Sequence, residues 1–308
     1  MRKTLKKSVL AGIIYVNDKD GRQDSNMIEF TKWQGCGNDF VLFDCRQEDA
    51  IDFSALARKV CDRHYGVGAD GILVVLPSNC ADFRMRIFNT DGSEAEMCGN
   101  GIRCFARYLY DSGLTDKTQF TVETGAGVLV PEIMLADGQV AGVKVDMGEP
   151  HLLGEEIPVA GYDGQRVINK PLAVAGQTYQ MTAVSMGNPH CVIFVDDAEK
   201  FPIYELGQQF ETHPSFPKKT NTEFVQVKDR QHVRMRVWER GAAVTLACGT
   251  GSCATVVAGI LNDKLDRKVE VELDGGCLTV EWAENNHVFM TGPAELVFSG
   301  KLTDCEAR

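Results

Sequence analysis

The sequence contains 308 residues, with 43 Asp and Glu against 32 Lys and Arg, and a formal net charge of −11 at pH 7. This acidic balance argues against a nucleic-acid-binding protein, which usually carries a basic face. A hydrophobic content of 44% excludes a disordered or low-complexity chain, and the length predicts two domains of about 100–200 residues each.

The segment 1–26 begins with four basic residues and continues into a short apolar run at 9–16. The run is shorter than a membrane-spanning helix, and no small-residue cleavage site follows it. We therefore expect residues 1–26 to be an N-terminal extension of a cytoplasmic protein. The first domain is expected to open at Met27.

The remaining chain is dominated by strand patterns, in which apolar and polar residues alternate between glycine-bearing turns. Few segments have a helical pattern, and two of these each follow a Cys-Gly-x-Gly sequence. In chain order, the predicted elements are a helix at 53–63, a strand at 83–88, a helix at 101–111, strands at 143–146 and 233–238, a helix at 251–262 and a strand at 278–282. This balance predicts an α+β fold.

Three short motifs recur at one offset of 150 residues. A search for such internal repeats comes early in reading a sequence, because a repeat changes the predicted fold. The repeated motifs are Gly37-Asn38 with Gly187-Asn188, Arg84-Met85-Arg86 with Arg234-Met235-Arg236, and Cys98-Gly99-Asn100-Gly101 with Cys248-Gly249-Thr250-Gly251. The repeat predicts two halves of one topology, related by a pseudo-twofold axis.

The sequence contains 11 cysteines, an odd number spread along the whole chain. Such a distribution is not typical of a secreted disulfide framework. No C-x-x-C pair of a zinc ribbon or thioredoxin-type motif is present, so we expect no metal. Most cysteines, including Cys104 and Cys253 within the predicted helices, are expected to pack as small buried hydrophobes.

Cys98 and Cys248 differ from the other cysteines because each directly precedes a predicted helix. The helix dipole and the free N–H groups of a helix start lower the pKa of a thiol and bind anions. If both helix starts face one bound carboxylate, one thiolate and one thiol can invert a stereocentre, because inversion needs a base on one face of the carbon and an acid on the other. The sequence therefore predicts a two-base racemase or epimerase.

Six segments closely resemble the diaminopimelate epimerase family: GCGNDF at 35–40, FNTDGSE at 88–94, MCGNG at 97–101, MGNPH at 186–190, WERG at 238–241 and ACGTG at 247–251. The resemblance covers about Met27 to the C-terminal end. It implies cofactor-independent conversion of LL-2,6-diaminopimelate to the meso isomer, in the synthesis of lysine and peptidoglycan precursors. It also implies a homodimer and two halves, 27–146 and 147–293, each a β-barrel-like sheet around a central helix, with the segment 294–308 returning to the first half.

The resemblance also implies site residues. Cys98 and Cys248 are expected to be the proton donor and the proton acceptor, with His190 and Glu239 assisting their proton balance. Backbone N–H groups of the two helix starts are expected to bind the reacting carboxylate, and Arg, Glu and Asn side chains suit the other, zwitterionic end of the substrate. The implied substrate ligands are Asn38, Asn89, Gly99, Asn100, Asn188, Asn221, Glu239, Arg240, Gly249 and Thr250. Some family members carry Gln where Gly71 stands, so no side-chain contact is expected there.

Three alternatives are open from the sequence. One is another cofactor-independent racemase of the same fold, acting on histidine, a glutamate-like or a proline-like substrate. The second is a metal or redox protein that uses the thiols, for which the cysteine spacings are poor. The third is a non-enzymatic binding protein on the same scaffold.

Overall fold

The computed structural model describes residues 28–47 and 51–302, so the predicted extension at 1–26 lies outside the described residues. The described chain divides into two compact units. Unit 1 comprises residues 28–35, 39–133 and 294–302, and unit 2 comprises 36–38 and 134–293. The boundary after Ile133 corrects the predicted one after 146, because β9 (Gln139–Asp146) pairs with β18 (Val288–Gly292) of unit 2.

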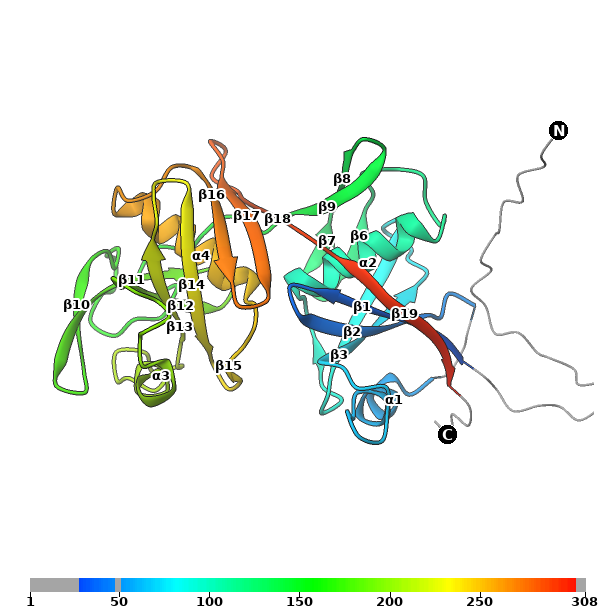
Figure 1. Cartoon of the computed structure of the whole chain (residues 1–308), viewed down its shortest axis with the longest axis horizontal. Helices are drawn as coiled ribbons and strands as arrows, with labels where there is room; N and C mark the ends of the chain where they lie inside the picture. Colours follow the sequence, from blue (N-terminus) through cyan, green and yellow to red (C-terminus); the bar gives the residue numbers. More distant parts are fainter. Residues whose placement is uncertain (1–27, 48–50, 303–308) are drawn as a thin grey trace, which may run out of the picture. The chain divides into compact units, whose positions relative to one another are not determined.

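The described part of unit 1 contains an eight-stranded sheet in the order β19-β1-β2-β3-β4-β6-β7, with β5 paired to β4. The C-terminal strand β19 pairs with β1, so the two ends of the described chain lie side by side (Figure 1). Its elements are β1 Ile28–Gly35, β2 Asn38–Asp44, α1 Phe53–Val60, β3 Gly71–Leu76, β4 Phe83–Asn89, β5 Glu94–Ala95, α2 Gly99–Asp111, β6 Val122–Thr124, β7 Gly127–Leu129 and β19 Glu295–Leu302.

The described part of unit 2 contains an eleven-stranded sheet in the order β10-β11-β12-β13-β14-β16-β17-β18-β9-β8, with β15 paired to β14. Besides β9 and β18, its elements are β8 Glu132–Ala136, β10 Lys170–Val174, β11 Gln177–Ser185, β12 Pro189–Phe194, α3 Ile203–Glu211, β13 Asn221–Val227, β14 His232–Glu239, β15 Ala243–Val244, α4 Gly249–Leu261, β16 Lys268–Leu273 and β17 Gly276–Trp282. The helix α3 is absent from the predicted elements, although it begins 150 residues after α1.

The two units repeat one topology. The strand order β2-β3-β4-β6-β7 of unit 1 matches β12-β13-β14-β16-β17 of unit 2. The first and third pairs of each series are parallel, and the second and fourth are antiparallel. The register also repeats, since Phe40 lies opposite Gly71 and His190 lies opposite Asn221. The offset of 150 residues is therefore a repeat of strand pairing as well as of sequence.

Each sheet curves around a buried helix (Figure 1). In unit 2, α4 contacts seven strands of its sheet, and its residues 251–259 are all buried. In unit 1, α2 packs against β1, β3, β4 and β19 and buries Ile102, Phe105 and Leu109 completely. A helix such as α4, which is largely apolar on all sides, must lie inside a core. Cys104 and Cys253 lie in these helices and are fully buried, as expected for packing cysteines.

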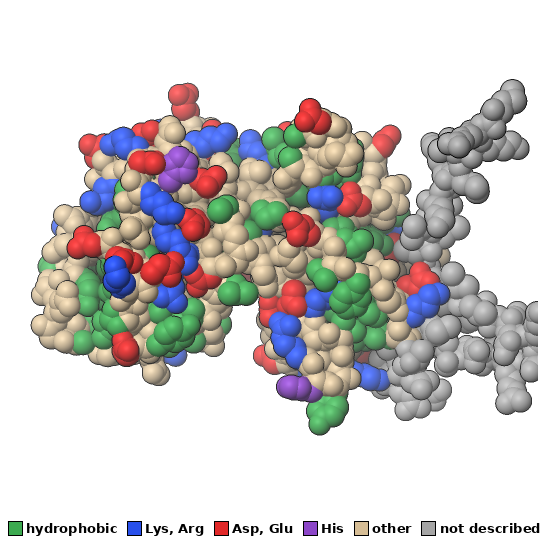
Figure 2. Space-filling model, viewed as in Figure 1, with side chains coloured by type: hydrophobic (Ala, Val, Ile, Leu, Met, Phe, Trp, Pro, Cys, Tyr) green, Lys and Arg blue, Asp and Glu red, His purple; other side chains and the backbone are tan. Residues whose placement is uncertain are grey.

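The repeated arginines of β4 and β14 form ion pairs. Arg86 pairs with Glu94 at 2.7 Å and lies over the ring of Phe88. Arg234 pairs with Glu199 at 2.7 Å and with Asp274. Figure 2 shows Lys and Arg side chains interspersed with Asp and Glu on this face of unit 2. These arginines therefore neutralise neighbouring carboxylates.

Among residues 28–47 and 51–302, no helix has both the length and the apolar character needed to cross a membrane.

The packing of α3 on β14 depends on Gly207, because a Cβ there would lie 2.2 Å from the ring of Trp238. We expect Gly207→Ala to lower the free energy of unfolding by about 1–3 kcal/mol, since the ring must move to admit the methyl group. The melting temperature of the variant measures this effect. Gln208→Ala, at the next and exposed position of α3, is the matched control and should melt with the parent protein. Equal melting temperatures for both variants would contradict the packing argument.

Candidate active site

The thiols of Cys98 and Cys248 cap the N-termini of the two buried helices. Both residues have extended backbone angles, and each Sγ accepts a hydrogen bond from the N–H of the third residue on. The distance is 3.5 Å from Gly101 N to the sulfur of Cys98 and 3.4 Å from Gly251 N to that of Cys248. The N-cap usually carries Ser, Thr, Asp or Asn, whose oxygen accepts this bond. Here a sulfur takes the place of that oxygen in both units.

The surroundings of Cys248 oppose the expected lowering of its pKa. Burial raises the pKa of this thiol well above its ordinary value, and the carboxylates of Glu239 and Glu223 raise it further. Hydrogen bonds to the sulfur from Thr250 and Gly251 act in the opposite direction and are smaller. The expectation that the helix start lowers this pKa is therefore wrong for Cys248, because desolvation of the thiolate outweighs the N–H groups.

Glu239, at the end of β14, is a hydrogen-bond partner of Cys248. Its carboxylate accepts hydrogen bonds from the Thr245 hydroxyl and the Cys248 thiol. Burial raises the pKa of Glu239, and these two hydrogen bonds oppose that rise. A carboxylate with a raised pKa is a stronger base, so proton transfer from the thiol to it costs less free energy.

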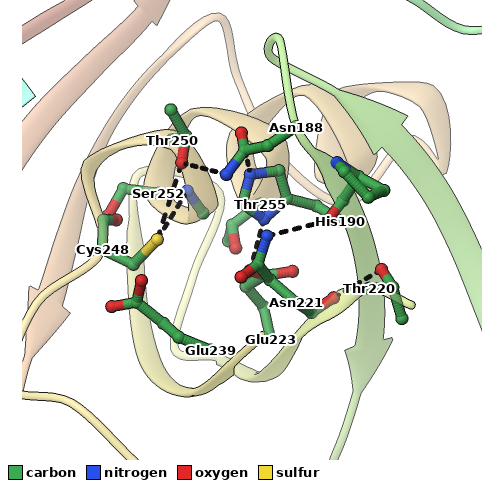
Figure 3. A network of polar contacts seen from close by, with 12 residues as sticks. Asn188, His190, Thr220, Asn221, Glu223, Glu239, Cys248, Thr250, Ser252 and Thr255 are labelled. Carbon is green, nitrogen blue, oxygen red and sulfur yellow. Dashed lines mark hydrogen bonds and ion pairs between the residues drawn. The ribbon is translucent and has the colours of Figure 1, made fainter. Parts of the chain in front are cut away.

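A chain of hydrogen bonds runs from a buried carboxylate to the same sulfur (Figure 3). Glu223 Oε1 lies 2.7 Å from His190 Nδ1, and His190 Nε2 lies 3.0 Å from Asn188 Oδ1. Asn188 Nδ2 donates to Thr250 Oγ1 at 3.3 Å, and this hydroxyl lies 3.6 Å from Cys248 Sγ. The structure thus brings together five of the predicted site residues of unit 2, Asn188, His190, Glu239, Cys248 and Thr250.

Glu223 is missing from the predicted site, although it is fully buried at its centre. It lies two residues after Asn221 on β13, so both side chains are on one face of the strand. Glu223 is the one charged residue of the segment NTEFVQV, and this is the signal that could have identified it. Thr245, the partner of Glu239, has no comparable signal in the sequence.

Asn221 and Arg240 occupy one corner of the unit 2 site. The Asn221 amide donates to the Pro189 carbonyl at 2.9 Å and accepts from the Arg240 N–H at 2.9 Å. Asn221 therefore joins β12, β13 and the turn after β14. The guanidinium of Arg240 donates to the Lys218 carbonyl at 3.1 Å, and the residue is exposed.

The predicted ligands of unit 1 lie at the ends of its strands and at the start of α2. Asn89 ends β4 and donates its amide to Ser93 Oγ at 3.0 Å. Gly99 and Asn100 form the first turn of α2, as Gly249 and Thr250 do in α4. Asn38 is the first residue of β2, and the turn 36–38 that it ends is assigned to unit 2. Gly71 begins β3, at the position of Asn221 in unit 2.

In the described ranges, no group of three or more His, Cys, Asp and Glu side chains is placed to hold a metal ion. Cys61, Cys80, Cys191, Cys248 and Cys277 are free thiols, and Cys305 lies outside the described residues.

The fold is shared with solved structures of several protein families, including amino-acid epimerases. A PhzF-family phenazine biosynthesis protein of Bacillus anthracis matches with a TM-score of 0.67 and 20% identity, over 90% of this chain and 99% of that one. A hydroxyproline epimerase from Agrobacterium vitis matches with a TM-score of 0.62 and 15% identity, over 91% and 94% of the two chains. At such identities these matches establish the fold alone.

Sequence similarity identifies the family. Residues 30–153 and 182–297 match the family described as diaminopimelate epimerase. The diaminopimelate epimerase of Pelotomaculum thermopropionicum is 56% identical over 276 residues, which are 89% of this chain and 98% of that protein. That of Agathobacter rectalis is 54% identical over 282 residues, covering 89% and 99%. The chain belongs to the diaminopimelate epimerase family.

The electrostatics of Cys248 lead to a prediction for Glu239→Gln. This change removes a negative charge beside the sulfur, so we expect the pKa of the thiol to fall. The pH midpoint of Cys248 alkylation by iodoacetamide, read by mass spectrometry of its peptide, measures the shift. Thr250→Val removes a hydrogen bond to the sulfur and should raise the midpoint. Glu284→Gln, at an exposed turn of the same unit, is the control, and a midpoint for Glu239→Gln at or above that of the control would contradict the argument.

Proposed function

We propose that the protein is a cofactor-independent diaminopimelate epimerase, which interconverts LL- and meso-2,6-diaminopimelate in lysine biosynthesis. The observation that carries the proposal is the pair of cysteines that cap the two buried helices with the same geometry. The similarity to diaminopimelate epimerases over 89% of the chain supports this substrate.

In the proposed mechanism, the Cys248 thiolate removes the Cα proton and the Cys98 thiol donates a proton to the opposite face of the same carbon. The C–H bond broken is replaced by a C–H bond of inverted configuration, with no net oxidation. The product leaves Cys248 as thiol and Cys98 as thiolate, so the reverse reaction uses the exchanged roles. Glu239 supports the forward direction by accepting the thiol proton of Cys248 before the reaction.

The charge that develops as the proton leaves spreads onto the substrate carboxylate. We propose that the N–H groups at the starts of α2 and α4 stabilise it, through Gly99 and Asn100 in unit 1 and Gly249 and Thr250 in unit 2. At the distal end of the substrate, the exposed guanidinium of Arg240 suits the second carboxylate. The remaining proposed ligands are Asn38, Asn89, Asn188, Asn221 and Glu239.

Solvent exchange tests the reaction directly. In D₂O, conversion of LL-diaminopimelate should give meso product with one deuterium at the inverted Cα, since the donated proton comes from an exchangeable thiol. This incorporation is measured by mass spectrometry. Product without deuterium would overturn the mechanism, and turnover of proline or glutamate in place of diaminopimelate would point to another racemase of this fold.

Substitution of the two thiols tests their roles. We expect Cys98→Ala and Cys248→Ala each to lower kcat by at least about a thousandfold, because each removes one of the two acid/base groups. Circular dichroism should show that both variants fold. Cys80→Ala in unit 1 and Cys277→Ala in unit 2 replace exposed thiols and should retain the parent activity. Full turnover by either Cys98→Ala or Cys248→Ala would rule out the two-base scheme.

We also infer that the protein is a cytoplasmic homodimer. Cys80 and Cys277 are exposed free thiols, which suits a reducing compartment. Among the described strands, β19 is an edge strand, and about half of the surface of its Leu296, Val297 and Phe298 is exposed. Figure 2 shows hydrophobic side chains gathered over this strand. An apolar edge strand favours pairing with a second copy, which would cover it.

Light scattering after size-exclusion chromatography tests the dimer. The parent protein should have the mass of two chains, and the double variant Leu296→Glu with Val297→Glu should have the mass of one, because the charges oppose burial of β19. Tyr65→Glu alters another strongly exposed apolar residue of unit 1 and should remain dimeric. A monomeric parent protein would overturn the inference.

A further inference from the structure

Glu223 and His190 form a buried pair that the proposed two-thiol reaction leaves without a stated role. Both side chains have no exposed surface, and Glu223 Oε1 lies 2.7 Å from His190 Nδ1. Glu223 Oε2 is buried without a hydrogen-bond partner among the described residues. A carboxyl group buried in this way costs several kcal/mol unless it is neutral or strongly paired.

The neighbours of His190 determine where its ring protons lie. Asn188 donates its amide nitrogen to Thr250 Oγ1, so its Oδ1 faces the ring. An amide oxygen only accepts, so Nε2 must carry a proton. At Nδ1, either a protonated Glu223 donates to the ring or the ring donates to the Glu223 carboxylate. In both cases Nε2 keeps its proton.

This arrangement gives the hydrogen-bond chain one direction. His190 Nε2–H donates to Asn188, Asn188 donates to Thr250, and the hydroxyl of Thr250 is left to donate to the sulfur of Cys248. In the opposite tautomer Nε2 carries no proton and accepts a hydrogen bond, so the Asn188 amide would have to rotate and present its NH₂ group to the ring. The Thr250 hydroxyl would then donate to Asn188 Oδ1 and be lost to the sulfur. The position of one ring proton thus decides whether the thiolate of Cys248 receives this donor.

The internal repeat indicates that the fold does not require the pair. At the equivalent positions of unit 1, 150 residues earlier, stand Phe40 and Leu73, both buried. A Cβ on Gly101 would lie 3.2 Å from Leu73 Cδ2, and one on Gly251 would lie 2.7 Å from Glu223 Oε1. Glu223 therefore lies beside the start of α4 as Leu73, with its hydrocarbon side chain, lies beside the start of α2. The same topology exists with an apolar pair, so packing alone does not account for His190 and Glu223.

We propose that Glu223 is a positioning residue: by engaging Nδ1 of His190 it keeps the ring proton on Nε2, and so directs the Asn188–Thr250 hydrogen bonds toward the Cys248 sulfur. The expected effect of Glu223 on turnover rests on the proposed function. The expected position of the His190 ring proton does not depend on it.

The electrostatic surroundings support the donor role of Glu223. Burial raises the pKa of Glu223, and the charge of Glu239 raises it further, whereas His190 opposes the rise. The carboxyl group is thus held toward its protonated form, which donates to Nδ1. The titratable groups that interact with its charge are His190 and Cys191 of β12, Glu239 of β14 and Cys248 of α4.

The ring protons can be observed in the full-length parent protein by ¹⁵N–¹H NMR of labelled histidine, with His190→Phe to assign the signal among six histidines. We expect His190 to carry a proton on Nε2 at every pH at which the protein is folded. A neutral ring protonated at Nδ1 alone would overturn the proposal. This measurement needs neither a substrate nor a variant of Glu223, so it stands even if the proposed reaction is wrong.

Two variants of Glu223 separate positioning from packing. Glu223→Leu places the unit 1 residue beside His190. It should allow the Nδ1–H tautomer and lower kcat by at least about tenfold with little change in KM. Glu223→Gln retains an N–H that can donate to Nδ1, so it should keep the Nε2–H tautomer and recover most of the activity.

Thr222→Val is the matched control, because this buried hydroxyl lies on the same strand without a hydrogen-bond partner among the described residues. It should behave as the parent protein in the tautomer of His190 and in kcat. If Glu223→Leu matches this control in tautomer and kcat, Glu223 is only a packing residue and the proposal fails. If Glu223→Leu does not fold, Glu223→Gln decides, and a ring protonated at Nδ1 alone in that variant overturns the proposal.

Discussion

The hydrogen bond from a helix N–H to a cysteine sulfur is the interaction on which the candidate site depends. Each unit wraps its sheet around one helix, so the first turn of that helix begins inside the protein. Free N–H groups in such a place must find acceptors. Cys98 and Cys248 supply them, and this fixes both sulfurs at the positive end of a helix dipole. Capping the helix and placing the thiol are therefore one structural requirement.

Burial at the second helix start has an electrostatic cost. It raises the pKa of Cys248 and of Glu239, two groups that share a hydrogen bond. Raising both values disfavours two neighbouring negative charges and leaves one proton between a thiol and a carboxylate. In the proposed reaction, the Cys248 thiolate forms by transfer of this proton to Glu239, which leaves the net charge of the pair unchanged.

The two units show how one topology carries different chemistry. Strand order and register agree between them, but the positions of Phe40, Gly71 and Leu73 in unit 1 are those of His190, Asn221 and Glu223 in unit 2. The polar chain that reaches the Cys248 sulfur runs through Glu223 and His190, whose counterparts in unit 1, Leu73 and Phe40, have no polar side-chain atoms. The repeat therefore accounts for the paired thiols, whereas the departures from it account for the different surroundings of Cys248.

The sequence by itself determined the α+β class, the repeat of 150 residues and the two cysteines at helix starts, because these depend on local patterns: alternation along strands, and glycines after Cys98 and Cys248. The three helices and four strands that it predicted overlap observed elements, but it did not predict α3, most of the described strands or the unit boundary after Ile133. The boundary depends on which strands pair, and β9 pairs with a strand more than a hundred residues later. Only the tertiary structure decided that Glu223 lies beside His190 and that the pKa of Cys248 is raised rather than lowered. Burial and the proximity of charges are set by residues distant in the chain, so no local pattern contains them.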